Sequence, residues 1–146
     1  MDKALVLEML KTRIREKIGK LEDLIEETRS SNSETKSSMG DKYETGREML
    51  QQEINNLQLQ LNENRKAESV LKNLSAVPHQ VIGNGSLVET DAGFFYIAVS
   101  GGELKLAQTK IFAVSPDSPV AKVMTGKKSG DKFAVNGITR VIRNIW

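Results

Sequence analysis

Asp41 and Glu44 are the two carboxylates in this chain whose spacing best suits a chemical role. They stand three residues apart, so one helical turn would place both on the same side of the chain. Carboxylate oxygens are ligands that Mg²⁺ prefers, and an exposed pair could therefore help to hold a Mg²⁺ ion that a partner supplies. Such pairs are common, and a solvated turn without chemistry is the alternative interpretation.

The other residue types that catalyse reactions are missing or poorly placed. There is no cysteine, which excludes disulfides, zinc–thiolate sites and a thiol nucleophile. The single histidine, His79, has no spacing typical of metal ligands, and we interpret it as a surface or packing residue. The run Gly126-Lys127-Lys128-Ser129 resembles the end of a phosphate-binding loop, but Ala121 stands where that loop has its first glycine. A basic turn is the better interpretation, and we expect neither a self-contained enzyme nor a resident cofactor.

The composition is that of a protein with much exposed surface. Of 146 residues, 38% are hydrophobic and 27% are charged. The net charge of +2 is too small to argue for nucleic-acid binding on its own. The chain begins with charged residues rather than a signal peptide, and its longest apolar run, residues 94–99, is too short to cross a bilayer. We therefore expect a cytoplasmic protein without a membrane partner.

Two long helices must position the carboxylates. Apolar residues at three- and four-residue steps predict one helix over residues 3–29 and a second over about residues 46–75. The first stripe comprises Leu7, Leu10, Ile14, Ile18, Leu21, Leu24 and Ile25, and the second comprises Leu50, Ile54, Leu57, Leu61 and Leu71. Each stripe is too narrow to be buried alone, so we expect an antiparallel coiled-coil hairpin. The Ser-, Thr- and Gly-containing segment between the helices predicts a turn, with an acidic tip near residues 38–46.

The second half of the chain predicts a small β-rich domain. Pro78 and a glycine turn end the helical region. Strands are predicted at residues 86–90, 94–99, 110–114, 132–135 and 139–145. Ser118 followed by Pro119 predicts the start of one short helix. The fold class is therefore α+β with two domains, residues 1–76 and residues 77–146.

The order of these parts resembles the bacterial Gre-type transcript cleavage factors, GreA and GreB. Their tip motif has the form Gly-Asp-Leu-x-Glu-Asn-Ala-Glu-Tyr, and Gly40, Asp41 and Glu44 match it. In the second half, residues 117–122 followed by Gly126-Lys127 look like the family's Ser-Pro-Ile/Met-Ala-Arg…Gly-Lys segment. The resemblance covers nearly the whole chain.

This resemblance implies a fold and a mode of action. The C-terminal domain would be an FKBP-like antiparallel β-sheet domain that docks on RNA polymerase at the rim of its secondary channel, with Asp117, Ser118 and Pro119 in the docking role. The coiled coil would enter the channel as part of a monomer. Asp41 and Glu44 would help to hold the second Mg²⁺ of the polymerase site, which then cleaves backtracked RNA at its 3′ end.

A basic face of the first helix and several departures from the family bear on this interpretation. Arg13, Lys17 and Lys20 lie at helical spacing and form one basic face of the first helix. A basic helix face is usually solvated, but it could also guide a phosphate chain. The three residues are therefore RNA-contact candidates. At Lys42, Thr45, Gly46 and Arg47 the sequence differs from the family motif, which changes the charge and shape of the tip. A channel-binding modulator or inhibitor without cleavage activity is therefore the first alternative. A structural coiled-coil adaptor and an isolated prolyl isomerase follow, since an FKBP-like fold does not fix function.

Overall fold

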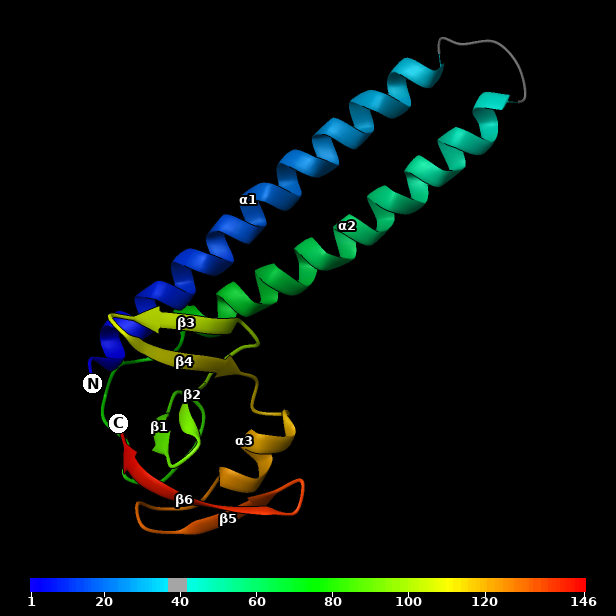
Figure 1. The fold of residues 1–146 in the computed structure, drawn as a ribbon. Helices are drawn as coiled ribbons and strands as arrows, with labels where there is room; N and C mark the ends of the chain where they lie inside the picture. The colour runs from blue at the N-terminus through cyan, green and yellow to red at the C-terminus, as the bar shows by residue number, and fades with distance from the viewer. Residues whose placement is uncertain (37–41) are drawn as a thin grey trace. The chain divides into compact units, whose positions relative to one another are not determined.

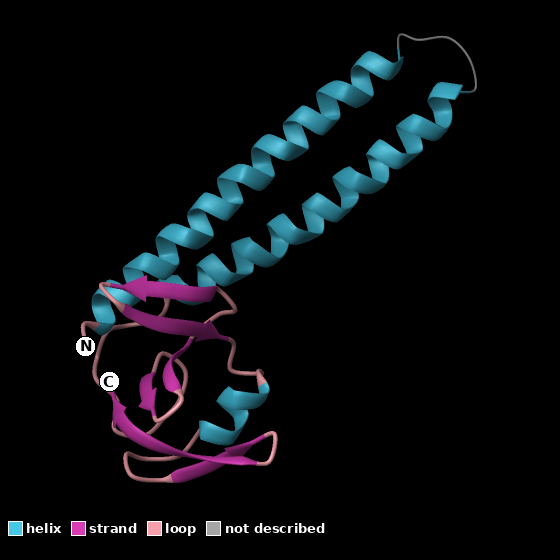
Figure 2. Ribbon diagram, viewed as in Figure 1, coloured by secondary structure: helices cyan, strands magenta, loops and turns pink. Residues whose placement is uncertain are grey.

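A computed structural model describes the backbone of residues 1–36 and 42–146, and the side chains of residues 1–31 and 46–146. It contains two long helices, six strands and one short helix in that part of the chain (Figures 1 and 2). Contacts divide the chain into two compact units. Met1–Arg13 and Ser69–Trp146 form one, which we call the sheet unit, and Ile14–Glu68 forms the other, which we call the hairpin unit. The domain boundary predicted between residues 76 and 77 lies inside the sheet unit.

The predicted helical hairpin is confirmed. Helix α1 spans Lys3–Lys36 and helix α2 spans Lys42–Lys72. In the hairpin unit the two helices bury one shared apolar core, made of Leu21, Ile25, Ile54 and Leu61 with Ile18 and Leu57 packed against it. Leu24 was predicted to lie in the buried stripe but is 45% exposed, because Ile25 takes the inward position beside it.

Polar contacts cover the outside of the hairpin. Arg65 of α2 lies 3.3 Å from the carboxylate of Glu22 of α1. Along α2, side-chain amides bond one helical turn apart, and the Gln58 amide nitrogen lies 3.1 Å from the side-chain oxygen of Asn62.

Among the described residues, no helix is long and apolar enough to span a membrane.

The sheet unit contains a six-stranded sheet in the order β3-β4-β2-β1-β6-β5. The strands are β1 Leu87–Thr90, β2 Gly93–Ile97, β3 Gly102–Leu106, β4 Thr109–Val114, β5 Lys132–Val135 and β6 Ile138–Ile145. Neighbouring strands are antiparallel except β2 and β4, which pair in parallel. The predicted α+β class is confirmed, but the sheet is mixed where an antiparallel one was expected, because the unpredicted strand β3 precedes β4 and reverses its direction.

The short helix α3, Pro119–Met124, packs on one face of this sheet. Its Ala121 and Met124 join a buried cluster whose other members are Ile82, Val88, Ile97, Phe133 and Ile142. Side chains alternate along β2, so that Phe95 packs against this cluster, whereas Phe94 stacks on Trp146 with ring centroids 6.3 Å apart.

The first turns of α1 belong to the sheet unit, and two of their cationic side chains donate hydrogen bonds to the rest of it. The ammonium of Lys3, which is 4% exposed, donates to the carbonyl oxygens of Val77 at 2.8 Å and Trp146 at 3.0 Å. Burial lowers the pKa of Lys3, and the two carbonyls partly replace its lost hydration. The guanidinium of Arg13 donates to the carbonyl oxygen of Gly101 at 3.0 Å and also to that of Glu103.

Candidate functional site

The acidic tip predicted from the sequence joins α1 to α2. Helix α1 ends at Lys36 and α2 begins at Lys42, so residues 37–41 connect them. Gly40 and Asp41 lie outside the described residues. The backbone of Glu44 falls in the first turn of α2, but its side chain also lies outside the described part. The proposed Mg²⁺ role of the two carboxylates therefore stays a prediction.

The described residues offer no alternative metal centre. Among the described residues, no group of three or more His, Asp or Glu side chains is placed to hold a metal ion. His79 is a packing histidine whose Nδ1 lies 2.6 Å from the Ser86 hydroxyl oxygen. That oxygen also accepts from the Gly83 amide at 2.9 Å, so its own proton is free to be donated to a neutral imidazole. Burial lowers the pKa of His79, and the charge of Lys3 lowers it further.

The predicted docking residues form the start of α3. The Ser118 hydroxyl accepts from the Ala121 amide at 3.3 Å and donates to the Ser115 carbonyl at 2.8 Å, which makes Ser118 the N-cap. Pro119 occupies the first helical turn, and both Pro119 and Asp117 are exposed. The helix cap is confirmed, and the hydroxyl is used within the chain. A partner would therefore meet the exposed Asp117 and Pro119 rather than the hydroxyl of Ser118.

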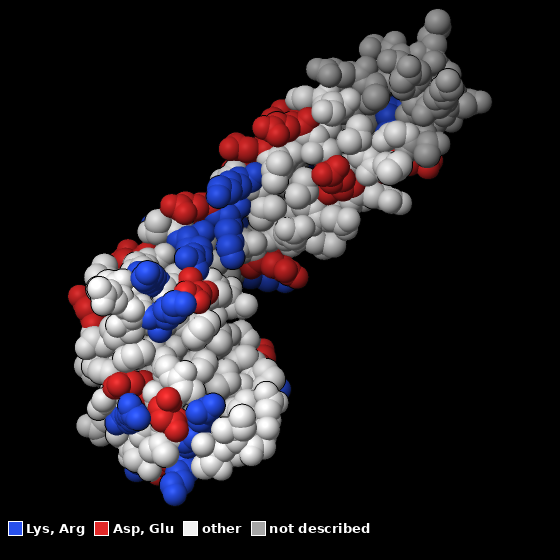
Figure 3. Space-filling model, viewed as in Figure 1, with Lys and Arg blue, Asp and Glu red and all other residues white. Residues whose placement is uncertain are grey.

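The three predicted RNA-contact residues differ in whether their cationic groups are already bound within the chain. The guanidinium of Arg13 is already bound to backbone carbonyls of the sheet unit. Lys17 and Lys20 are exposed on the hairpin unit and make no ion pair with any described residue. In the view of Figure 3, basic side chains gather over the lower hairpin with acidic ones on either side. Of the three candidates, Lys17 and Lys20 therefore retain ammonium groups available to a phosphate chain.

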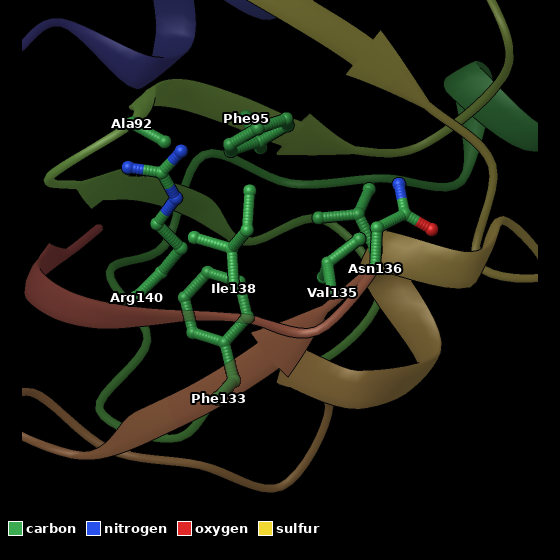
Figure 4. A pocket seen from close by; sticks show the side chains of 8 residues that line it. Ala92, Phe95, Phe133, Val135, Asn136, Ile138 and Arg140 are labelled. Atoms are coloured by element: carbon green, nitrogen blue, oxygen red, sulfur yellow. The ribbon is translucent and has the colours of Figure 1, made fainter.

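A pocket in the sheet unit was not predicted. It has a volume of about 300 Å³ and is lined by Ala92, Phe95, Val120, Phe133, Val135, Asn136, Ile138 and Arg140. These residues come from the β1–β2 turn, from β2, from α3 and from the β5–β6 hairpin. Figure 4 shows the Arg140 guanidinium beside Ala92 at one side of the pocket and Asn136 at the other. Val120 directly follows Pro119, so the predicted docking segment runs into the pocket wall.

Neither a protein-family model nor a curated protein matches the chain. Solved structures do resemble it. The transcription factor Gfh1 is 20% identical, with 92% of this chain and 90% of that chain covered and a TM-score of 0.39. The GreA factor homolog 1 (Gfh1) of Thermus thermophilus is 18% identical, with 93% and 94% covered and a TM-score of 0.39. Gfh1 of Thermus aquaticus is 19% identical, with 87% and 92% covered and a TM-score of 0.34. All three are structures of Gfh1, and each aligns with most of this chain.

Proposed function

We propose that the protein is a cytoplasmic transcription elongation factor that binds RNA polymerase through its secondary channel and stimulates cleavage of backtracked nascent RNA. The observation that carries the proposal is the hairpin. Helix α1 has 34 residues, about 50 Å at the rise of an α-helix, and the segment that joins it to α2 contains Asp41. A paired rod that ends in a short acidic connection is suited to delivering carboxylates into a narrow passage.

The proposed chemistry takes place in the polymerase site rather than in this protein. Asp41 and Glu44 would contribute oxygen ligands toward the second Mg²⁺ of that site and help to orient the attacking water. The pair of metal ions would supply charge stabilisation for hydrolysis. The protein acts as a monomer, has no cofactor of its own and is not itself an enzyme.

Binding would use the sheet unit and the exposed cations. Asp117, Ser118 and Pro119 take the docking role, with the exposed Asp117 and Pro119 making the contact. Lys17 and Lys20 take the role of contacts to the phosphates of the RNA 3′ end, because their ammonium groups make no ion pair with any described residue.

A second candidate is a channel-binding modulator without cleavage activity. The tip sequence favours it, because Lys42 stands where the family motif has leucine and Arg47 stands where it has glutamate. Two added positive charges within six residues of Asp41 oppose the binding of a cation by the tip carboxylates.

The deciding experiment uses a stalled, backtracked elongation complex and follows the length of the RNA. The wild-type protein is expected to produce shortened RNA, and the double variant Asp41→Asn with Glu44→Gln is expected to lose at least about tenfold in cleavage rate. Glu53→Gln, which neutralises an exposed carboxylate outside the tip motif, is the matched control and keeps the wild-type rate.

Two other outcomes of this experiment would contradict the cleavage role. If the wild type binds polymerase and slows nucleotide addition without shortening RNA, the modulator is correct. If it does not bind polymerase, both candidates fail and a structural adaptor remains.

A further inference from the structure

The dipeptide Asn-Gly occurs twice in this chain, and the fold gives its two copies different surroundings. One is Asn84-Gly85 in the loop before β1, and the other is Asn136-Gly137, the two-residue turn between β5 and β6. In such a pair the backbone nitrogen of the glycine can attack the side-chain amide of the asparagine, because glycine has no Cβ to shield that nitrogen. Asparagine is a thermolabile residue for this reason, and the surroundings of each pair decide whether it reacts.

The backbone nitrogen of Gly85 is held inside the sheet unit. Its N–H donates to the carbonyl oxygen of Ile97 at 2.6 Å, and Gly85 itself is buried. A Cβ atom at Gly85 would lie 3.3 Å from Leu74 and 3.6 Å from His79, so side chains cover the glycine. An attack on the side chain of Asn84 would first have to break this buried hydrogen bond.

The backbone nitrogen of Gly137 is open to solvent. Its N–H donates no hydrogen bond to any described residue, and Asn136 and Gly137 are both exposed. A Cβ atom at Gly137 would meet nothing within 4 Å. The φ angles of 53° at Asn136 and 75° at Gly137 are those of a type I′ turn, whose two central residues project beyond the strand ladder. Nothing in the described chain therefore holds this nitrogen away from the asparagine side chain.

We propose that Asn136 is a site of spontaneous deamidation and that Asn84 is protected from it. The Gly137 nitrogen forms a bond to Cγ of Asn136, the bond from Cγ to the side-chain nitrogen breaks, and ammonia leaves with the former Gly137 amide proton. The resulting cyclic succinimide is opened by one water molecule, which restores the Gly137 N–H and leaves a carboxylate. Attack of water at one ring carbonyl gives aspartate, and attack at the other gives isoaspartate. This inference goes beyond the proposed function and does not depend on it.

The two products should affect the β5–β6 hairpin differently. Aspartate leaves the backbone of the turn unchanged, because Asp-Gly suits a type I′ turn as Asn-Gly does. Isoaspartate adds the side-chain methylene to the main chain, so the turn no longer fits the observed pairing of Val135 with Ile138. Strand β5 contributes the buried Phe133 to the core, so the isoaspartyl product should loosen the sheet unit. Both products also place a negative charge across the pocket from Arg140 (Figure 4).

Peptide mass spectrometry of the full chain, incubated for weeks in mildly alkaline buffer, tests the proposal. The tryptic fragments 133–140 and 73–105 each carry one Asn-Gly pair, and their fragment-ion spectra locate the mass change at Asn136 or Asn84. We expect deamidation at Asn136 to be at least about tenfold faster than at Asn84. The same chain unfolded in guanidinium chloride is the matched control. Both pairs are exposed there, and their rates should become similar.

A second measurement separates the two products. Asn136→Asp supplies the aspartate product directly, and it should keep the wild-type midpoint of urea unfolding, followed by the fluorescence of Trp146. The isoaspartyl fraction of the incubated wild type, identified by methyl transfer from S-adenosylmethionine with an isoaspartate methyltransferase, should unfold at a lower urea concentration.

Several results would overturn the inference. One is a folded chain in which Asn84 reacts as fast as Asn136. Another is a folded chain in which Asn136 is unchanged when the unfolded chain has lost both amides. An isoaspartyl fraction that unfolds at the same urea concentration as the fresh protein would overturn the effect on the hairpin. None of these readouts involves polymerase, so they stand or fall separately from the proposed function.

Discussion

The guanidinium of Arg13 donates a hydrogen bond to the carbonyl oxygen of Gly101 over 3.0 Å. Gly101 directly precedes β3, and Arg13 ends the part of α1 that belongs to the sheet unit. One turn earlier, the buried Leu10 packs so closely on Gly101 that a Cβ atom there would overlap its Cδ1 and lie 3.2 Å from the Cβ of Ala113. Helix α1 is therefore held at this point by both a hydrogen bond and close packing.

Gly101→Ala should destabilise the sheet unit. Leu10 must leave its rotamer within a packed core, which costs about 1–3 kcal/mol of the free energy of unfolding. Urea unfolding followed by the fluorescence of Trp146, the single tryptophan, measures this cost in the sheet unit. Gly83→Ala is the control, because its Cβ would meet nothing within 4 Å and its backbone φ is not positive. Equal midpoints for the two variants would show that the contact with Leu10 is not tight.

Arg13→Ala should lower the free energy of unfolding of the sheet unit by about 1–2 kcal/mol. The reason is that two backbone carbonyls lose a charged donor. Lys17→Ala, which removes an exposed cation one turn further along α1, should change it by less than about 0.5 kcal/mol. The same tryptophan signal measures both. If Arg13→Ala leaves stability unchanged and instead weakens binding to an elongation complex, the predicted RNA contact is the better account of this residue.

In the hairpin unit, stability should depend on the apolar core and hardly on the ion pairs. Leu61 is buried in that core, so Leu61→Ala should cost about 2–4 kcal/mol through lost burial and the cavity that remains. Glu22→Gln breaks the ion pair with Arg65, but both side chains are about half exposed, and the cost should be below about 0.5 kcal/mol. Thermal unfolding followed by the helical circular dichroism signal compares them, and a larger loss for Glu22→Gln would contradict this ranking.

His79 should make stability fall in mild acid. Its pKa in the folded chain lies below the ordinary value of 6.5, chiefly because of burial. As pH drops through about 6.5, the unfolded chain takes up a proton that the folded chain does not, so folding is increasingly disfavoured until the lower pKa is reached. In His79→Asn the melting temperature should therefore fall less between about pH 7.5 and pH 5 than in the wild type. Parallel curves for the two proteins would rule out this contribution.

The sequence predicts the hairpin well because apolar spacing alone determines which helix face is buried. It places the end of α1 too early, at residue 29 rather than Lys36, since the serine-rich segment that follows contains neither glycine nor proline to stop the helix. It also misses β3. The turn between β3 and β4 contains Ala107 at a φ of 56°, a conformation that usually marks glycine or asparagine, so the hairpin carries no recognisable turn residue.

Some candidate sites could likewise be predicted from the sequence, and others depend on the fold. Asp41, Glu44 and the cap at Ser118 are local patterns and can be recognised along the chain. The pocket depends on strand register, which brings Phe133 opposite Arg140 and places both near Ala92, some forty residues earlier. The hydrogen bond of Arg13 likewise depends on Gly101, 88 residues away, so the basic face of the helix could not predict it.

The discontinuous sheet unit has a consequence for the hairpin. Because Met1–Arg13 and Ser69–Trp146 fold together, the hairpin unit is an insertion in chain order. Its apolar core repeats at roughly seven-residue intervals, so removing one heptad from each helix keeps the remaining side chains in register. Each such deletion shortens the hairpin by about 10 Å. A graded set of shortened chains, all carrying an unaltered sheet unit, would serve as a molecular ruler for the depth of the polymerase channel that the tip is proposed to enter.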